Sequence, residues 1–142
     1  MRAFFDTNVL VYLFDGDAPG KREAARSLLQ QEADAGRATL STQVLQEFFV
    51  TVTRKLAVPL GHEQAERAVR NLAELSVVQV DAGLVFAGIE LARRLQVSLW
   101  DALIVGAALQ SGSTVLYTED LQHGQRIDGL TVANPFAALQ TR

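Results

Sequence analysis

Short apolar segments alternate with longer segments of helical composition along nearly the whole chain, and this alternation most constrains the fold. The expected strands lie at residues 2–5, 38–40, 77–80 and 114–118, with a possible fifth at 130–132. Strands that alternate with helices pair in parallel, and both faces of such a sheet need to be covered by helices. We therefore predict an α/β fold, a three-layer sandwich in which a short central parallel sheet of four to five strands is flanked by helices.

The segments between the strands carry the signals that begin and end helices. Ser41, Asp81 and Ser98 each precede a helical segment and are suited to cap it. The last of these segments, LWDALIVGAALQSG at 99–112, is apolar nearly all round, so its helix should be buried. Expected helices cover 7–14, 21–35, 42–56, 62–75, 82–95 and 99–112, a loop covers 119–125, and a short tail helix follows 134–136.

Length and composition limit the class of protein. A chain of 142 residues is enough for one domain and too short for two, so we expect a single domain over 1–142. The absence of cysteine excludes disulfides, thiolate metal sites and cysteine nucleophiles, and two histidines make an imidazole zinc site improbable. No apolar run approaches the ~18 residues of a membrane span, and the apolar start contains an acid and no cleavage site. We expect a cytoplasmic protein.

Acidic residues stand at or near several of the expected strand ends. Asp6 directly follows the first strand, and Glu119 and Asp120 follow the strand at 114–118. Asp101 opens the apolar helix, and Glu47 lies in the helix after the second strand. Ligands of open α/β sheets bind at the carboxyl ends of the strands. We therefore expect these carboxylates to face one crevice.

Each acid also has a local explanation. Asp6 can cap the helix that follows it, and Asp101 forms with Ser98 a Ser-x-x-Asp sequence close to a capping box. Glu47 lies on a polar strip of its helix that solvent would cover, and the two acids after the 114–118 strand can form a turn. No single acid decides between a site and these alternatives.

The acids taken together favour a metal site. An ionised Asp101 buried in the most apolar helix would be costly unless it were paired, hydrogen-bonded or bound to a metal. No lysine occurs after Lys55, so few cationic partners exist. A divalent cation relieves the repulsion between converging carboxylates, and ligands that are all oxygen suit Mg²⁺ or Mn²⁺. The net charge of −3 also means that binding to nucleic acid would need a bound cation or a local basic face.

Five segments share an order and a set of neighbours with one known family: DTNVLVY at 6–12, LQEFF at 45–49, LWDALIVGAA at 99–108, LYTEDLQHGQ at 116–125 and LTVANPF at 130–136. Together they resemble the PIN-domain ribonucleases, and among them the VapC-type toxins of prokaryotic toxin–antitoxin pairs. The resemblance spans essentially the whole chain and implies that the sandwich is PIN-like. It implies a metal-dependent endoribonuclease that hydrolyses RNA to 5′-phosphate and 3′-OH ends with Mg²⁺ or Mn²⁺.

The resemblance also implies roles for particular residues and partners. The catalytic and metal-binding acids would be Asp6, Glu47, Asp101 and Asp120, with Asp6 and Asp101 as the chief ligands. Thr7, Asn8, Thr118 and Glu119 would support them. The partners implied are an RNA substrate, a second copy of the chain in a homodimer, and a small antitoxin protein whose tail fills the acidic groove. No membrane is implied.

Three other classes compete with this reading. A receiver-like signalling domain normally needs a lysine near its last strand, and this chain has none after Lys55. A haloacid-dehalogenase phosphatase needs Asp-x-Asp after the first strand, where this chain has Asp6-Thr7-Asn8. A non-catalytic RNA-binding or scaffold PIN domain remains the alternative, although such a domain is expected to have lost acids and this one is complete.

A few residues near these motifs have open roles. His123 either contacts phosphate or only hydrogen-bonds the backbone of its loop. Trp100 is expected in the core or at the rim of the site, with base stacking as the alternative. A basic rim, or else an ordinary solvated surface, would be formed by Arg22, Arg26, Arg54, Lys55, Arg93 and Arg94.

Overall fold

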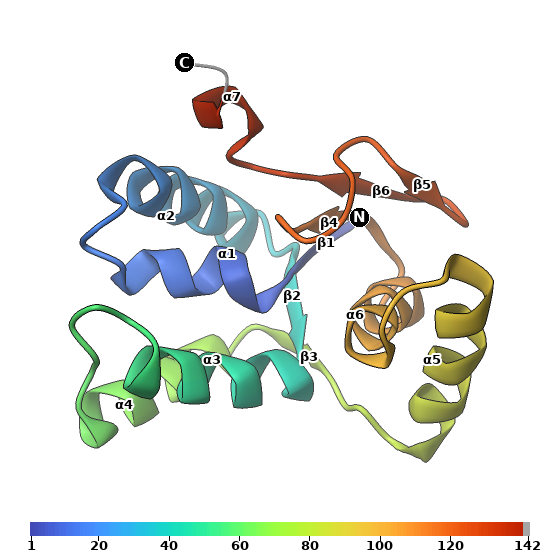
Figure 1. Ribbon diagram of the computed structural model, residues 1–142, viewed down its shortest axis with the longest axis horizontal. Helices are drawn as coiled ribbons and strands as arrows, with labels where there is room; N and C mark the ends of the chain where they lie inside the picture. The colour runs from blue at the N-terminus through green and yellow to red at the C-terminus, as the bar shows by residue number, and fades with distance from the viewer. Residues whose placement is uncertain (141–142) are drawn as a thin grey trace.

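The computed structural model describes residues 1–140 and shows a central sheet between two groups of helices (Figure 1). The strands are β1 (Arg2–Phe5), β2 (Ala38–Ser41), β3 (Ser76–Val78), β4 (Ser113–Tyr117), β5 (Arg126–Ile127) and β6 (Leu130–Ala133). They lie in the order β3-β2-β1-β4-β6-β5. All neighbours pair in parallel except β5 and β6. The predicted α/β class is confirmed.

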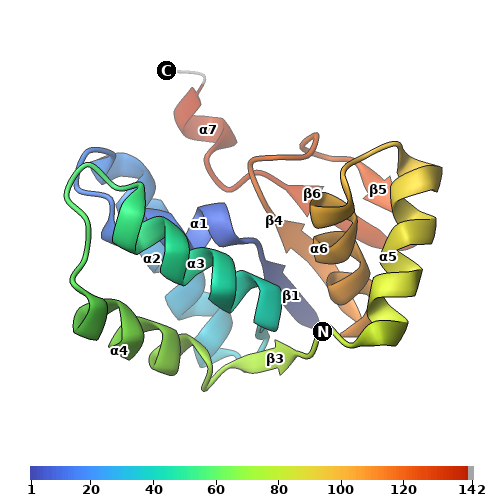
Figure 2. The ribbon, with the colours of Figure 1, turned by 60° about the horizontal axis from the view of Figure 1, so that its bottom comes forward.

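The helices cover both faces of the sheet, as predicted. The first four, α1 to α4, lie on one side and α5 and α6 on the other, which Figure 2 shows from a second direction. The helices are α1 (Thr7–Val11, continued by the 3₁₀ turn η1, Tyr12–Phe14), α2 (Pro19–Asp34), α3 (Thr42–Arg54), α4 (His62–Leu72), α5 (Ala82–Leu95), α6 (Leu99–Gln110) and α7 (Ala137–Gln140). The predicted tail helix is thus present as α7, and residues 141–142 lie outside the described residues.

The predicted strand count is wrong, because the sheet has six strands where four to five were expected. The additional strand, β5, pairs antiparallel with β6 in a hairpin. Asp128 and Gly129 connect the two strands with φ of 49° and 89°. An Asp-Gly pair with two positive φ angles is the preferred two-residue hairpin turn. The sequence therefore held a signal for this strand that the pattern of apolar residues did not reveal.

β1 lies inside the sheet, between β2 and β4, and this position decides where the chain places its first acid. Phe4 and Phe5 are completely buried. The backbone N–H of Asp6 donates to the carbonyl oxygen of Tyr117 at 3.0 Å, which continues the pairing with β4 by one residue. Asp6 therefore lies near the middle of the sheet, at its carboxyl edge.

The three predicted helix caps are all present. The side-chain oxygens of Ser41, Asp81 and Ser98 accept from the backbone N–H groups of Val44, Leu84 and Asp101 at 3.3, 2.9 and 3.1 Å. Residues 102–108 of α6 are all buried between the sheet and α5, as the apolar sequence predicted. Within residues 1–140, no helix has the length and apolar character needed to cross a membrane.

Candidate active site

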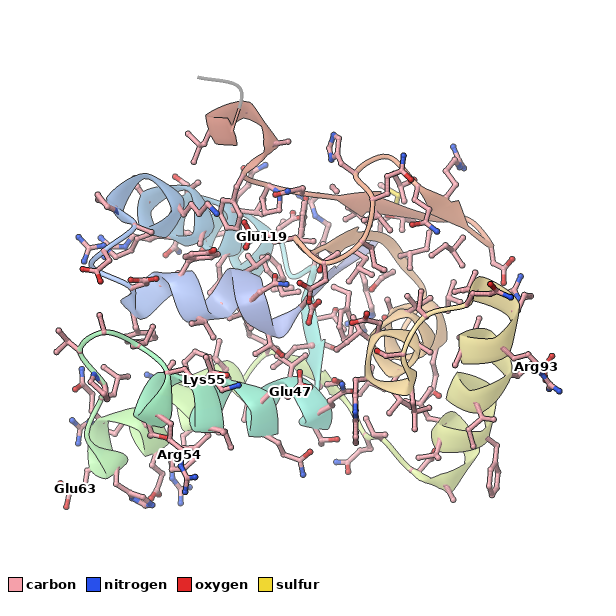
Figure 3. All side chains as sticks on the ribbon, viewed as in Figure 1. Glu47, Arg54, Lys55, Glu63, Arg93 and Glu119 are labelled. Carbon is pink, nitrogen blue, oxygen red and sulfur yellow. The ribbon has the colours of Figure 1, made fainter. Side chains whose placement is uncertain are left out.

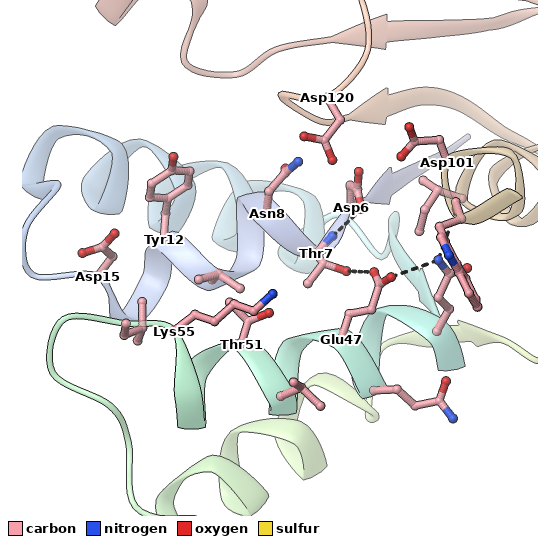
Figure 4. Close-up of a pocket in the computed structure, with 17 residues that line it drawn as sticks. Asp6, Thr7, Asn8, Tyr12, Asp15, Glu47, Thr51, Lys55, Asp101 and Asp120 are labelled. Atoms are coloured by element: carbon pink, nitrogen blue, oxygen red, sulfur yellow. Dashed lines mark hydrogen bonds between the residues drawn. The ribbon is translucent and has the colours of Figure 1, made fainter. Parts of the chain in front are cut away.

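A pocket of about 670 Å³ opens at the carboxyl ends of β1 and β4, between α1, α3 and α6 (Figure 4). Five acids line it, and four of them are those expected from the sequence: Asp6 after β1, Glu47 in α3, Asp101 in the first turn of α6, and Asp120 in the loop after β4. The fifth is Asp15, which follows η1. Figure 3 shows Glu47 reaching from α3 toward α1. The structure thus brings to one pocket side chains that are up to 114 positions apart in the chain, from Asp6 to Asp120.

Asp6 is the buried acid of the group, with 5% of its surface exposed. Its Oδ1 accepts from the backbone N–H of Thr7 at 2.7 Å, and its Oδ2 accepts from Thr118 Oγ1 at 2.8 Å. Burial raises the pKa of Asp6 to about 7, and the charges of Asp120 and Glu47 act in the same direction, while the two hydrogen bonds oppose the rise. Asp6 therefore caps α1, as the local explanation predicted, and it also lines the pocket.

Glu47 is half-buried, and Gln43 on the same strip is buried, so the local alternative of a solvated strip is wrong. Its Oε1 accepts from Thr7 Oγ1 at 2.8 Å, and its Oε2 accepts from Gln43 Nε2 at 3.2 Å. The same Gln43 nitrogen donates to the carbonyl oxygen of Trp100 at 3.2 Å. Thr7 and Gln43 therefore hold the Glu47 carboxylate in place.

Asp101 is half-exposed, and the expectation that it is buried is wrong. It lies in the first turn of α6, ahead of the buried run that begins at Ala102. Ser98 Oγ accepts from its backbone N–H at 3.1 Å, so the cap expected at this helix start is present. The cost of burying a charge, which the sequence suggested for Asp101, applies instead to Asp6.

Asp120 is exposed as a residue, and its carboxyl group faces the other acids of the pocket (Figure 4). Partial burial of the carboxyl group raises the pKa of Asp120, and the charge of Asp101 raises it further. Contact with the Asn8 side chain opposes this rise. Thr118 Oγ1 accepts from the Asp120 backbone N–H at 3.0 Å, so one hydroxyl contacts both Asp6 and the start of this loop.

Glu119 does not line the pocket with the other acids. It accepts a hydrogen bond from the Tyr12 hydroxyl at 2.9 Å and forms an ion pair with Lys21 at 2.7 Å. The Lys21 amino group also lies 4.8 Å from the centre of the Tyr12 ring. These contacts tie the loop that carries Asp120 to η1 and α2.

Some lining residues were not among the sequence candidates, namely Tyr12, Asp15 and Gln43. Gln43 precedes Glu47 by one helical turn, and this spacing was the signal that would have found it. Trp100 is 63% exposed and stands at the rim. His123 Nδ1 accepts from the backbone N–H of Asn134 at 2.9 Å, which confirms the backbone explanation for this histidine.

The chemistry of the pocket fits a hard divalent cation. The four acids supply only oxygen ligands, and none of them takes part in an ion pair among the described residues. Gln43 Oε1 is buried without a hydrogen-bond partner in that part of the chain, and such orphaned atoms occur where water or an ion binds. As the side chains stand, no group of three or more acids or histidines in residues 1–140 is drawn tightly enough together to hold an ion. A divalent cation held by three of these acids would therefore need their carboxylates closer together than they stand.

Comparisons with known proteins agree with this fold. A family model described as PIN domain matches residues 3–128. A toxin–antitoxin complex from Klebsiella pneumoniae has a similar structure, with a TM-score of 0.70 and 23% identity over 94% of this chain and 97% of that chain. The sarcin–ricin loop cleaving toxin VapC20 of Mycobacterium tuberculosis has a TM-score of 0.67 and 24% identity over 83% and 89% of the two chains.

A third similar structure is VapBC2 from Rickettsia felis, bound to a DNA fragment from its promoter. It has a TM-score of 0.64 and 21% identity over 94% of this chain and 98% of that chain. A comparison with curated proteins gives no match. At these identities the structural comparisons establish a shared fold.

Proposed function

Because the chain belongs to the PIN domain family, we propose that it is a metal-dependent endoribonuclease that hydrolyses RNA phosphodiester bonds and leaves 5′-phosphate and 3′-OH ends. The observation that carries this proposal is the convergence of Asp6, Glu47, Asp101 and Asp120 on one pocket at the carboxyl edge of the sheet. Structural similarity to toxins of toxin–antitoxin pairs supports a second part of the proposal, that the protein is the toxin of a type II pair and acts in the cytoplasm.

In the proposed mechanism Asp6, Asp101 and Asp120 would hold Mg²⁺ or Mn²⁺, and Glu47 would be a further ligand or the group that orients water. Such an ion supplies a water of lowered pKa and offsets negative charge on the attacked phosphate. Hydrogen bonds from the Thr7 backbone N–H and the Thr118 hydroxyl already fix the Asp6 carboxylate, so this side chain would lose little conformational freedom on binding an ion.

The neighbours of these acids position them for the reaction. Thr7 Oγ1 and Gln43 Nε2 leave Glu47 little rotational freedom, so its carboxylate is ready to accept a hydrogen bond from the attacking water. The Asn8 amide lies between Thr118 and the loop of Asp120, with its Nδ2 donating to Thr118 Oγ1 at 3.4 Å. Water would attack the phosphorus in line and lose a proton, the bond between phosphorus and the 3′-oxygen would break, and the 3′-oxygen would take up a proton to become the 3′-OH.

The proposal is tested by incubating purified protein, freed of any antitoxin, with total RNA and transfer RNA. We expect cuts with Mg²⁺ or Mn²⁺ and none with EDTA, and the products should be degraded by an exonuclease that requires a 5′-phosphate. Asp6→Asn and Asp101→Asn should abolish the cuts. Asp34→Asn, which removes an exposed acid that does not line the pocket, should leave them unchanged.

Two outcomes would overturn the nuclease proposal. If the acid-to-amide variants cut RNA as the wild type does, the activity does not belong to this pocket. If the wild type binds metal and RNA but cuts neither these RNAs nor ribosomal RNA, the non-catalytic RNA-binding scaffold becomes the better description.

We further propose the partners that a toxin of this kind requires, a small antitoxin protein and a second copy of the chain. The neighbours described as toxin–antitoxin assemblies support the first of these. The gene adjacent to the coding sequence, co-expressed with it, should yield a complex that blocks RNA cleavage. Light scattering on the free protein should give the mass of two chains, and the mass of one chain would refute the dimer.

A further inference from the structure

One face of helix α3 presents a row of polar side chains to the pocket. Glu47, Thr51 and Lys55 are spaced by four residues, so they lie on one face of the helix, and all three line the pocket. With a rise of about 1.5 Å per residue, the backbone of Lys55 lies ~12 Å beyond that of Glu47 along the helix axis. The pocket thus has an acidic end near Asp6 and a second end formed by the last turn of α3.

Lys55 is the single lysine or arginine among the described residues that line the pocket, where five acids also occur. It is exposed and forms no ion pair with any of those acids. A lysine side chain at the end of a helix often only hydrogen-bonds the last backbone carbonyl groups of that helix. Here the side chain extends in the other direction, back along α3 toward Thr51 (Figure 4).

Figure 4 shows no hydrogen bond between the Thr51 hydroxyl and the other residues that line the pocket, so this hydroxyl and the Lys55 ammonium group face the pocket without a partner among those residues. Both are donors suited to a phosphate oxygen. We propose that Lys55 and Thr51 bind a backbone phosphate of the RNA strand next to, and not at, the bond that is cut. This inference rests on the proposed function, because the acidic end of the same pocket is where the cut would occur.

The occupant favoured by the chemistry is a nucleic-acid strand. A strand carries a negative charge at every nucleotide, so a strand whose scissile phosphate lies at the acids necessarily presents a neighbouring phosphate farther along the pocket. An acidic protein segment would also attract Lys55 and would meet the same five carboxylates, but only a strand bound for cleavage would have a phosphate at the acidic end that the proposed metal ion could hold. Contacts of this kind hold the backbone and do not read the base sequence.

The test measures binding of a fluorescein-labelled single-stranded oligouridylate of about ten nucleotides by fluorescence anisotropy, across a range of salt concentrations. All proteins carry Asp6→Asn to prevent cleavage, and Mg²⁺ is present. Lys55→Gln should weaken binding about tenfold. It should also reduce the slope of log K against log salt by about 0.7, the value for one phosphate contact on a single strand. Lys55→Arg should restore most of the affinity and the slope.

The matched control is Arg54→Gln, which removes the same charge from the adjacent residue. Arg54 is exposed, does not line the pocket, and extends away from it in Figure 3. It should leave affinity and slope nearly unchanged. Equal effects of Lys55→Gln and Arg54→Gln, or no measurable binding of the probe, would overturn the proposal. Competition by oligoglutamate for the protein that retains Lys55, with no effect of Lys55→Gln on oligouridylate binding, would assign Lys55 to an acidic protein partner instead.

Failure of this inference is distinguishable from failure of the proposed function. A protein that binds the probe through Lys55 but never cuts RNA would refute the nuclease and leave the phosphate contact in place. A protein that cuts RNA equally well with Lys55→Gln and shows an unchanged salt slope would refute the phosphate contact alone.

Discussion

Replacing Asp6 with asparagine should make the metal-free fold more stable. The pKa of Asp6 is raised from 3.8 to about 7, chiefly by burial. Each pKa unit corresponds to about 1.4 kcal/mol, so the ionised carboxylate lowers the free energy of unfolding by about 4 kcal/mol above pH 7. Asparagine removes this charge and keeps an oxygen for the Thr7 N–H. The amide nitrogen that replaces Oδ2 cannot accept the hydrogen bond from the Thr118 hydroxyl, and the Thr118 oxygen already accepts from the backbone N–H of Asp120. Losing this hydrogen bond should lower the free energy of unfolding by about 1 kcal/mol.

The net gain for Asp6→Asn should therefore be about 3 kcal/mol near pH 8 without divalent ions. The folded protein keeps the proton of Asp6 up to about pH 7, whereas the unfolded chain releases it near 3.8. The wild type thus loses stability from this group as pH rises from about 4 to 7, and the variant does not. The difference between the two should shrink to less than about 1 kcal/mol at pH 5.

Urea denaturation followed by circular dichroism, in EDTA at about pH 8 and about pH 5, measures this difference. Asp34→Asn serves as the control, because Asp34 is exposed, and it should show no such pH dependence. Adding Mg²⁺ should stabilise the wild type by mass action and the variant much less. An Asp6→Asn protein that is no more stable than the wild type at the higher pH, or a difference that is the same at both pH values, would refute the reasoning.

Three further predictions concern other parts of the structure. Lys21→Met should lower the free energy of unfolding by about 1–3 kcal/mol, because Glu119, whose side chain is 17% exposed, would lose its ion pair. Gly88→Ala should lower the free energy of unfolding by about 1 kcal/mol. The added Cβ would lie 2.6 Å from Leu103 Cδ2 and 3.2 Å from Leu103 Cγ. This overpacking destabilises the fold more than the higher helix propensity of alanine stabilises it. The fluorescence of Trp100, the sole tryptophan and 63% exposed, should change when Mn²⁺ is added, because paramagnetic Mn²⁺ would bind at the adjacent acid.

Each of these has its own control. Gly83→Ala meets only Asp81 Oδ1, at 3.5 Å, and should be neutral or stabilising, so a loss equal to that of Gly88→Ala would contradict the packing argument. Lys21→Met with unchanged unfolding in urea would show that the ion pair contributes nothing. The Mn²⁺ response of Trp100 should disappear in Asp101→Asn, and its persistence there would place the ion elsewhere.

Local features were predictable because short-range physics decides them. The caps at Ser41, Asp81 and Ser98 depend on a side-chain oxygen and an N–H three residues later, and all three are present. The burial of residues 102–108 follows from their apolar character alone. The β5–β6 hairpin at Asp128 was also encoded locally, but its two-residue strand is too short for a pattern of apolar residues to reveal.

The sequence by itself determined that strands and helices alternate, that helices cover both faces of a mostly parallel sheet, and that acids follow the strands. Only the tertiary structure decided that Asp6 and not Asp101 is buried. Asp6 follows a strand inside the sheet, whereas Asp101 lies in the first, half-exposed turn of its helix. It also decided the partners of Glu47 and Glu119, which are 40 and 98 positions away at Thr7 and Lys21. Such pairings depend on how whole elements pack against one another, and no local pattern of residues encodes that geometry.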